Sequence, residues 1–337
     1  MRFSRAVAAL LLGAALLSGC RKGHPEGRAI ALDARADWES ATRAALLSTA
    51  TLSSVDIGVS AFLFDGEWSQ TLPPNFFHNV PFSYGEGFWI SADQYFWPGS
   101  GHRLRFFCYA PYGAATLSGR EEPGAPVLQF TVADAGADQA DLLVADSGPV
   151  DGAERAFLPV NFSHALSAVR FAIKAGSRSG KLSGLRIGGL YNEASRSLAS
   201  GSSWTGFSGN ATYLLEGSFP YVRTETDWNL FEGNKGVFLL LPQARSNARI
   251  EALYQIQGEE DVLAISTGDF AIAWEPGKIY TYTLEIGESV RITVTVSGFA
   301  EVGPDAVFEV GVFPFVPALP SGEDYTGGEG DYWVTQP

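Results

Sequence analysis

The chain has 337 residues and a formal net charge of −14, from 23 Lys and Arg against 37 Asp and Glu. Binding to nucleic acid needs clustered basic side chains, so this acidic balance argues against a nucleic-acid partner. Hydrophobic residues make up 46% and aromatic residues 13% of the chain, which is ample for a hydrophobic core.

The N-terminus has the pattern of a lipoprotein signal peptide. Arg2 and Arg5 form a short positive segment, and the apolar run 6–17 that follows is too short to span a bilayer as a helix. The sequence Leu17-Ser18-Gly19-Cys20 is typical of a lipobox, in which small residues permit cleavage before a cysteine that carries lipid. We therefore predict a signal peptide over 1–19 and a mature chain that is lipidated at Cys20 and held to a membrane. An ordinary secretory signal with a chance cysteine is the alternative.

Residues 20–337 are long enough for two domains. The segment 21–28 contains Gly, Pro and charged residues without an apolar period, which predicts a tether. Residues 29–38 then alternate between apolar and other side chains, a weak strand pattern that ends near Trp38.

From Val55 onward, short apolar runs alternate with Gly, Pro, Asn and Asp, which predicts an all-β fold of the sandwich type. The runs include Val127 to Val132, Leu142 to Ala145, Val169 to Ile173, Leu182 to Ile187, Val237 to Leu241, Ile250 to Ile256 and Ile279 to Ile286. The small, polar stretch Asp146 to Glu154 is the predicted domain boundary. It gives an N-terminal β-sandwich over 44–150 and a C-terminal one over 151–337, which ends in a tail rich in Gly, Pro and acidic residues.

No motif for catalysis or metal binding is present in the sequence. The four histidines, at positions 24, 78, 102 and 164, have no ligand spacing with Cys or acidic residues, and there is no nucleophile elbow or phosphate-binding loop. His164 lies between strand-like segments, which predicts a structural histidine. Cys108 has no disulfide partner, and its apolar surroundings predict a buried, inert thiol. We therefore predict no catalytic residue, no cofactor and no metal site.

Several short segments recur in an order that is typical of one family. They are Thr42-Arg43-Ala44, Phe96 to Gly101, Leu104 to Tyr112, Asp141 to Ala145, Phe162 to Phe171, Leu240 to Gln243 and Trp274 to Tyr280. Together with the lipobox, they make the chain resemble the fimbrillin family of Bacteroidetes, the subunits and relatives of type V pili. The resemblance extends to about residue 286, whereas 287–337 match little.

The resemblance implies two tandem transthyretin-like β-sandwich domains, no cofactor and an assembly route. In the family, the lipidated precursor reaches the outer membrane, an Arg-specific protease removes an N-terminal strand, and the groove left behind accepts a strand from a neighbouring subunit. On this chain, 20–43 would hold the tether and the removable strand, with cleavage between Arg43 and Ala44. Arg28 and Arg35 are alternative cleavage positions.

The implied partners are other fimbrial subunits in a homo- or hetero-polymer, the outer membrane through the lipid, and host or bacterial surface ligands. Candidate donor strands are Ser289 to Val296 and Val307 to Val316, both β-rich and near the C-terminus. The expected location is the cell surface, in a fimbrium or anchored to the outer membrane. Stalk, anchor, tip and accessory roles all remain open.

Two other functions compete with the fimbrial one. A stand-alone surface lipoprotein would bind glycans through exposed aromatic side chains, among which Trp68, Trp89 and Trp97 are candidates, although core packing is the better default for each. A surface hydrolase is the least favoured alternative, because the four histidines are scattered and no nucleophile motif is present.

Overall fold

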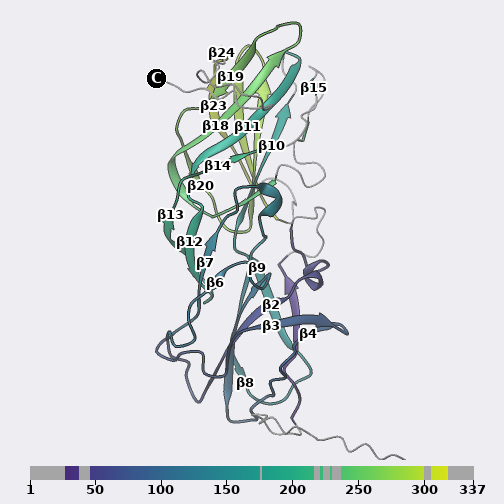
Figure 1. Ribbon diagram of the computed structural model, residues 1–337, viewed down its shortest axis with the longest axis vertical. Coiled ribbons are helices and arrows are strands. Elements are labelled where there is room, and N and C mark those ends of the chain that lie inside the picture. The colour runs from purple at the N-terminus through teal and green to yellow at the C-terminus, as the bar shows by residue number, and fades with distance from the viewer. Residues whose placement is uncertain are drawn as a thin grey trace, which may run out of the picture.

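The computed structural model describes residues 27–37, 46–174, 177–215, 221–222, 228–229, 237–299 and 305–317. Within these ranges the regular structure is β-strand, apart from two short 3-10 turns, η1 (Leu52–Ser54) and η2 (Gly136–Asp138). The prediction of an all-β fold is therefore confirmed. No helix in the described ranges is long and apolar enough to cross a membrane. The molecule is elongated, with a lower half, a waist and an upper half (Figure 1).

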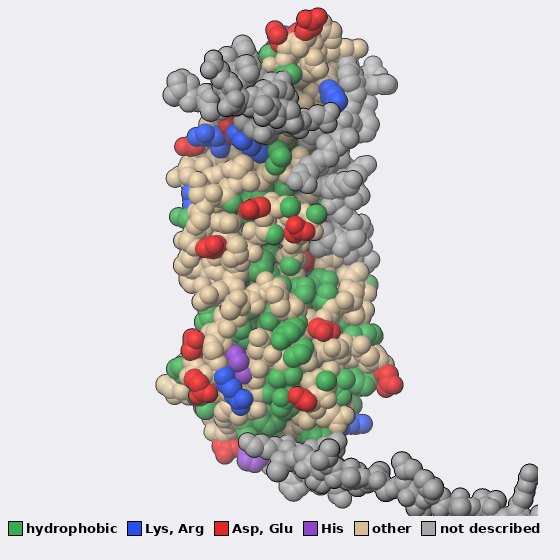
Figure 2. Space-filling model, in the orientation of Figure 1, with side chains coloured by type: hydrophobic (Ala, Val, Ile, Leu, Met, Phe, Trp, Pro, Cys, Tyr) green, Lys and Arg blue, Asp and Glu red, His purple; other side chains and the backbone are tan. Residues whose placement is uncertain are grey.

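Seven strands in the lower half form one sheet that closes on itself. Their order is β1-β4-β3-β2-β5-β8-β9, and the N-terminal strand closes the sheet because β1 pairs with both β4 and β9. The strands are β1 (Leu32–Ala36), β2 (Ile57–Phe64), β3 (Phe77–Gly85), β4 (Phe88–Ser91), β5 (Arg103–Ala110), β8 (Leu143–Asp151) and β9 (Leu158–His164). On the face shown in Figure 2, hydrophobic side chains gather over this half of the molecule.

The upper half contains two sheets. The first has the order β16-β10-β21-β22-β23, with β17 paired to β10, and β23 lies at its edge. Its strands are β10 (Ser167–Lys174), β16 (Trp228–Asn229), β17 (Val237–Leu240), β21 (Lys278–Ile286), β22 (Val290–Gly298) and β23 (Ala306–Phe313). The second has the order β14-β11-β18-β19-β24, with β15 paired to β11 and β20 to β18. Its strands are β11 (Gly180–Leu190), β14 (Ala211–Leu214), β15 (Tyr221–Val222), β18 (Ala244–Ile256), β19 (Val262–Ser266), β20 (Phe270–Ala273) and β24 (Val316–Pro317).

A four-stranded sheet forms the waist and joins parts of the chain that are distant in sequence. Its order is β13-β12-β7-β6. The strands are β6 (Thr116–Leu117), β7 (Val127–Thr131), β12 (Glu193–Ser197) and β13 (Trp204–Ser208). The pairing of β7 with β12 therefore links a segment that leaves the lower sheet to a segment between two strands of the upper half.

Strand β5 is buried on both faces. Phe106 and Cys108 belong to the cluster inside the closed lower sheet, whereas Phe107 and Tyr109 belong to the larger cluster that continues through the waist into the upper half. A strand with two buried faces has a nearly continuous apolar sequence instead of an alternating one, as 104–110 does. The outer face of β5 is thus part of the core that continues into the upper half.

The stretch that was predicted to separate two domains lies at the end of β8 and in the turn after it. Val150 pairs with Leu104 of β5, and β9, beyond the stretch, pairs with β8 again. Asp146 forms a bidentate ion pair with Arg105, at 2.9 and 2.6 Å, and accepts a hydrogen bond from the backbone N–H of Ser200 at 2.9 Å. This stretch therefore fastens the lower sheet to the loop between β12 and β13. A division of the chain at residue 150 stays a prediction.

Candidate assembly site

The N-terminal strand β1 lies between two strands that would be edges without it. Residues 32–36 pair in parallel with 158–162 of β9, and Leu32 pairs antiparallel with Trp89 of β4. Removing β1 would therefore break the ring of strands and leave β4 and β9 with unpaired backbone N–H and C=O groups. Such edges are templates for pairing with another chain.

The inward face of β1 fills the interior of the lower sheet. Ile30, Leu32 and Ala34 are 1%, 0% and 4% exposed, and all three belong to the buried cluster of this sheet. On the outward face, Asp33 and Arg35 form an ion pair at 3.3 Å. Burying a Leu or Ile side chain stabilises a fold by about 1.5–3 kcal/mol, whereas an exposed ion pair contributes at most about 1 kcal/mol. The inward side chains therefore hold the strand.

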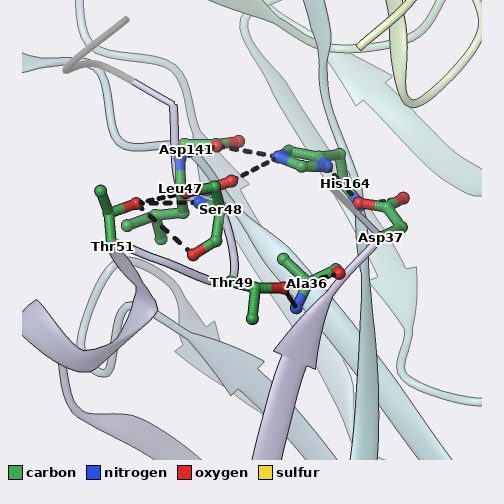
Figure 3. A network of polar contacts seen from close by, with 8 residues as sticks. All are labelled: Ala36, Asp37, Leu47, Ser48, Thr49, Thr51, Asp141 and His164. Atoms are coloured by element: carbon green, nitrogen blue, oxygen red, sulfur yellow. Dashed lines mark hydrogen bonds and ion pairs between the residues drawn. The ribbon is translucent and has the colours of Figure 1, made fainter. Parts of the chain in front are cut away.

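A buried histidine holds the C-terminal end of β1 (Figure 3). Asp37 Oδ1 lies 2.6 Å from His164 Nδ1, while His164 Nε2 lies 3.2 Å from Asp141 Oδ2 and 3.0 Å from the carbonyl oxygen of Leu47. The N–H of Leu47 donates to the same oxygen of Asp141 at 2.7 Å. Three segments that are distant in sequence thus meet at one imidazole. We name Asp37, Leu47, Asp141 and His164 the His164 latch.

The two carboxylates of the latch keep the imidazole charged. Burial alone would lower the pKa of His164, but its hydrogen bonds to Asp141 and Asp37 raise that pKa to about 10. The ring of Phe299 stacks on the imidazole, with the ring centroids 4.2 Å apart. Phe299 follows β22, so the latch also contacts the segment that leads toward β23.

Residues 36–37 and 47–49, on either side of the segment 38–45, lie close to each other beside His164. Thr49 Oγ1 accepts a hydrogen bond from the N–H of Ala36 and donates one to the carbonyl oxygen of Ala36, both at 3.1 Å. Asp37 and Leu47 both contact the latch histidine. The segment 38–45, which connects them, lies outside the described residues.

Strand β23 contrasts with β1 because, among the strands that the structure describes, it pairs with β22 alone and lies at the edge of its sheet. Val307, Phe308 and Val312 are 62%, 58% and 50% exposed. A cavity of about 350 Å³ lies against this strand and is lined by residues that include Trp274, Val294 and Phe308. The strand is therefore apolar and partly exposed, and within the described ranges its second backbone edge has no partner strand.

A model of the fimbrillin-like family matches residues 42–298 of this chain. The chain belongs to the fimbrillin-like family. The resemblance inferred from the sequence is thus confirmed, and the family places this fimbrillin-like chain among the proteins of cell-surface fimbriae.

Solved structures share the fold of this fimbrillin-like chain. It is similar to a fimbrial protein from Bacteroides vulgatus, with a TM-score of 0.63 and 18% identity over 80% of this chain and 99% of that one. It is also similar to a candidate cell adhesion protein from Bacteroides ovatus, with a TM-score of 0.50 and 16% identity over 86% of this chain and 98% of that one. At such identities the likeness shows the fold alone. No curated protein matches the chain.

The residues predicted to be processed in this fimbrillin-like chain lie mostly outside the described ranges. Cys20 precedes the first described residue, and Arg43 and Ala44 fall in the segment 38–45, which is not described. Lipidation and cleavage therefore stay predictions. The alternative cleavage positions Arg28 and Arg35 are described, and both are exposed.

The other residues singled out from the sequence are mostly buried. Cys108 is 0% exposed, and burial raises the pKa of its thiol, as expected for an inert cysteine. Trp89 and Trp97 are buried, and the guanidinium of Arg105 lies over the ring of Trp68 at 4.3 Å. These indoles therefore offer no open platform to a sugar ring. Among the described residues, no group of three or more His, Cys, Asp or Glu is arranged to hold a metal ion.

His164 is the structural histidine that the sequence predicted, but its two acidic partners were not identified from the sequence. Asp37 lies 127 residues away from it, and no spacing rule relates the two. Asp141 did carry a signal, because it opens one of the segments that resemble the family. Its role became visible only when the fold brought it to the imidazole.

Proposed function

We propose that this fimbrillin-like chain is a fimbrial subunit. It is exported as an outer-membrane lipoprotein that is anchored by lipid on Cys20, and it is assembled by strand exchange after cleavage between Arg43 and Ala44. The observation that carries the proposal is the position of β1, which fills the gap between β4 and β9 and thereby closes the lower sheet. It is also the first strand of the described chain, so cleavage after it would separate it from the rest of the fold.

The slot occupied by β1 has the properties that an incoming strand needs. Both flanking strands would offer backbone hydrogen bonds, and the interior would offer the apolar surface that Ile30 and Leu32 now cover. In strand addition of this kind, main-chain hydrogen bonds provide the affinity, and pockets for alternate side chains provide the specificity.

Of the two candidate donors, β23 is favoured over β22. Strand β22 is paired on both sides, with β21 and β23, and its Val290 and Ile292 are fully buried. Strand β23 has one partner among the described strands and already exposes apolar side chains. Its transfer to another subunit therefore disturbs the donor fold less.

The donor and the slot lie in different halves of the molecule. Strand β23 is in the upper half and β4, which borders the slot, is in the lower half (Figure 1). A strand from one subunit would thus fill the slot of the next in a head-to-tail contact. Heterologous contacts of this type produce an open filament when the rotation between subunits does not close a ring.

The experiment takes the protein from intact outer membranes and determines its N-terminal sequence and its apparent size without boiling. A chain that starts at Ala44 and runs as a heat-labile ladder supports the proposal. Lipidated Cys20 on a lone monomer would exclude the polymerising role and leave an anchor or a surface lipoprotein.

Two matched variants locate the cleavage. Arg43→Lys should leave the precursor uncut, because an Arg-specific protease does not accept Lys. Arg35→Lys, made on the exposed face of β1, should be processed as the wild type is. The reverse result would move the cleavage to Arg35.

A further inference from the structure

One arginine of the waist sheet is partly buried without an acidic partner. The Nε of Arg196 is shielded from solvent and forms no hydrogen bond with the described part of the chain. Arg105 and Arg186 are also partly buried, but each forms an ion pair with a carboxylate at 2.6 Å. Burial lowers the pKa of Arg196, and no described carboxylate raises it. Because an arginine stays protonated at neutral pH, the waist holds a positive charge without a counter-charge among the described residues.

Strand pairing turns Arg196 toward the interior of the molecule. Arg196 of β12 lies directly opposite Trp204 of β13, and side chains that are opposite each other on antiparallel strands lie on the same face. Trp204 is 6% exposed, and its indole N–H donates to the carbonyl oxygen of Ala165 at 2.7 Å. Arg196 therefore lies on the face of the waist sheet that packs against the core.

A cavity of about 290 Å³ lies beside Arg196, and we name it the Arg196 cavity. It is lined by residues of β12 and β13 in the waist and of β18 and β20 in the upper half (Figure 1). Trp204 and Trp274 form apolar walls. The indole N–H of Trp274 donates to the hydroxyl of Tyr282 at 3.1 Å, and that of Trp204 is also used, so both rings offer carbon surface to a ligand.

The border of the Arg196 cavity is polar and reaches the surface. Ser202 and Ser203 contribute hydroxyl groups, and Ser203 and Ala244 are exposed. The charged residues of the described lining are Arg196 and Glu275, which is exposed. The negative charge of Glu275 disfavours a doubly charged anion such as a phosphate monoester. A singly charged acid therefore suits the cavity better.

A carboxylated sugar has the chemistry that this lining can recognise. A guanidinium binds a carboxylate with two parallel hydrogen bonds, and the arriving anion would offset the cost of the unpaired buried charge. A sugar ring also has an apolar face of C–H groups for the indole walls and hydroxyls for the two serines. Ligand pockets usually measure about 300–1,000 Å³, so a cavity at the lower end of this range has room for one ring and not for a chain of them.

We propose that the Arg196 cavity binds one carboxylated sugar unit of a surface glycan, a uronic or sialic acid, with the guanidinium of Arg196 on its carboxylate. This inference goes beyond the proposed function, because it gives the subunit a ligand of its own. It depends on neither cleavage nor strand exchange, so the absence of a ladder on unboiled gels would leave it untouched.

The test titrates the purified full-length mature protein with glucuronic acid and N-acetylneuraminic acid by isothermal titration calorimetry. Glucuronamide and the methyl ester of N-acetylneuraminic acid are the matched ligands, because they keep the ring and lose the charge. At least one acid should bind, and its uncharged counterpart should bind about tenfold more weakly or worse. Equal binding of an acid and its counterpart, or no binding of either acid, would overturn the proposal. Acetate that binds as tightly as the acids would overturn the assignment to a sugar.

Matched variants locate the site. Arg196→Gln should weaken binding of the acid about tenfold or more, whereas Arg120→Gln, which changes an exposed arginine outside the cavity, should bind as the wild type does. Because Arg196→Gln removes an unpaired buried charge, it should not lower the free energy of unfolding. Unchanged affinity in Arg196→Gln would overturn the assignment.

A second variant blocks the cavity and keeps the arginine. Ala244→Phe enlarges an exposed residue at the border and should also weaken binding about tenfold or more, because the ring would occupy the space of the sugar. This variant decides the matter even if Arg196→Gln does not fold. Wild-type affinity in Ala244→Phe would place the ligand elsewhere on the molecule and overturn the site.

Discussion

The strands β1 and β23 differ in how far their apolar faces and backbone edges are used. Strand β1 is paired on both sides, its inward residues are fully buried, and the His164 latch holds its end. Strand β23 has a single partner strand in the described part of the chain, and three of its apolar side chains are at least half exposed. Folded proteins usually protect such edges, since they promote association. The difference indicates that β1 contributes more to the stability of the fold than β23 does.

The largest effect is expected at the latch. His164→Leu removes the cation that faces the buried Asp141 and should lower the free energy of unfolding by about 3–5 kcal/mol, measured by urea denaturation. His102→Leu is the matched control, because the His102–Asp65 pair at 2.9 Å is exposed and should contribute at most about 1 kcal/mol. Equal losses in the two variants would show that the latch does not hold β1.

A second comparison removes apolar volume from each strand. Leu32→Ala should lower the free energy of unfolding by about 3 kcal/mol, because Leu32 is completely buried and its loss leaves a cavity. Val312→Ala on β23 should lower it by about 0.5 kcal/mol or less, because Val312 is half exposed. Similar losses by denaturant titration would remove the distinction between the two strands.

The pH dependence of unfolding tests the charge on the latch. The pKa of His164 is raised from 6.5 to about 10 in the folded chain, so its stabilisation is complete below pH 6.5 and is lost as the pH rises through 10. The free energy of unfolding should therefore fall by at most about 1.4 kcal/mol per pH unit above pH 6.5. Measurements between pH 6.5 and 7.5 largely avoid the contribution of Cys108, whose thiol is half ionised in the unfolded chain near pH 8.5.

His164→Leu is the control for this dependence. It should have a nearly flat profile in the same window, and an identical slope in wild type and variant would assign the pH dependence to another group.

The smallest effect on stability is expected at the exposed edge. Phe308→Thr should change the free energy of unfolding by no more than about 0.5 kcal/mol, because Phe308 is 58% exposed. It should nevertheless reduce association at rising concentration in sedimentation velocity, because the apolar edge would be interrupted. Unchanged association would mean that the molecules do not associate through the edge formed by β23.

The sequence predicted those features that depend on local pattern. Alternation and turn residues indicated β structure, and the apolar run around Cys108 indicated a buried thiol, because both signals are local. The weak alternation over 29–38 predicted a strand, and β1 lies within that range.

Features that depend on contacts between residues distant in sequence could not be predicted from the sequence. Closure of the lower sheet by β1 pairs residue 32 with residues 89 and 158, and no local pattern specifies such a register. The same holds for the His164 latch, whose residues 37, 141 and 164 are distant in sequence. The exposure of β23 could not be predicted either, since an apolar run in a sequence predicts burial.

The double burial of β5 has a mechanical consequence. Because Phe106 packs within the lower sheet and Phe107 within the core of the upper half, bending the molecule at its waist would open a packed interior instead of turning a hinge. The ion pair between Arg105 and Asp146, tied to Ser200, resists the same deformation. The subunit should thus respond to load as a stiff rod, and a filament of such rods would bend and stretch at its joints.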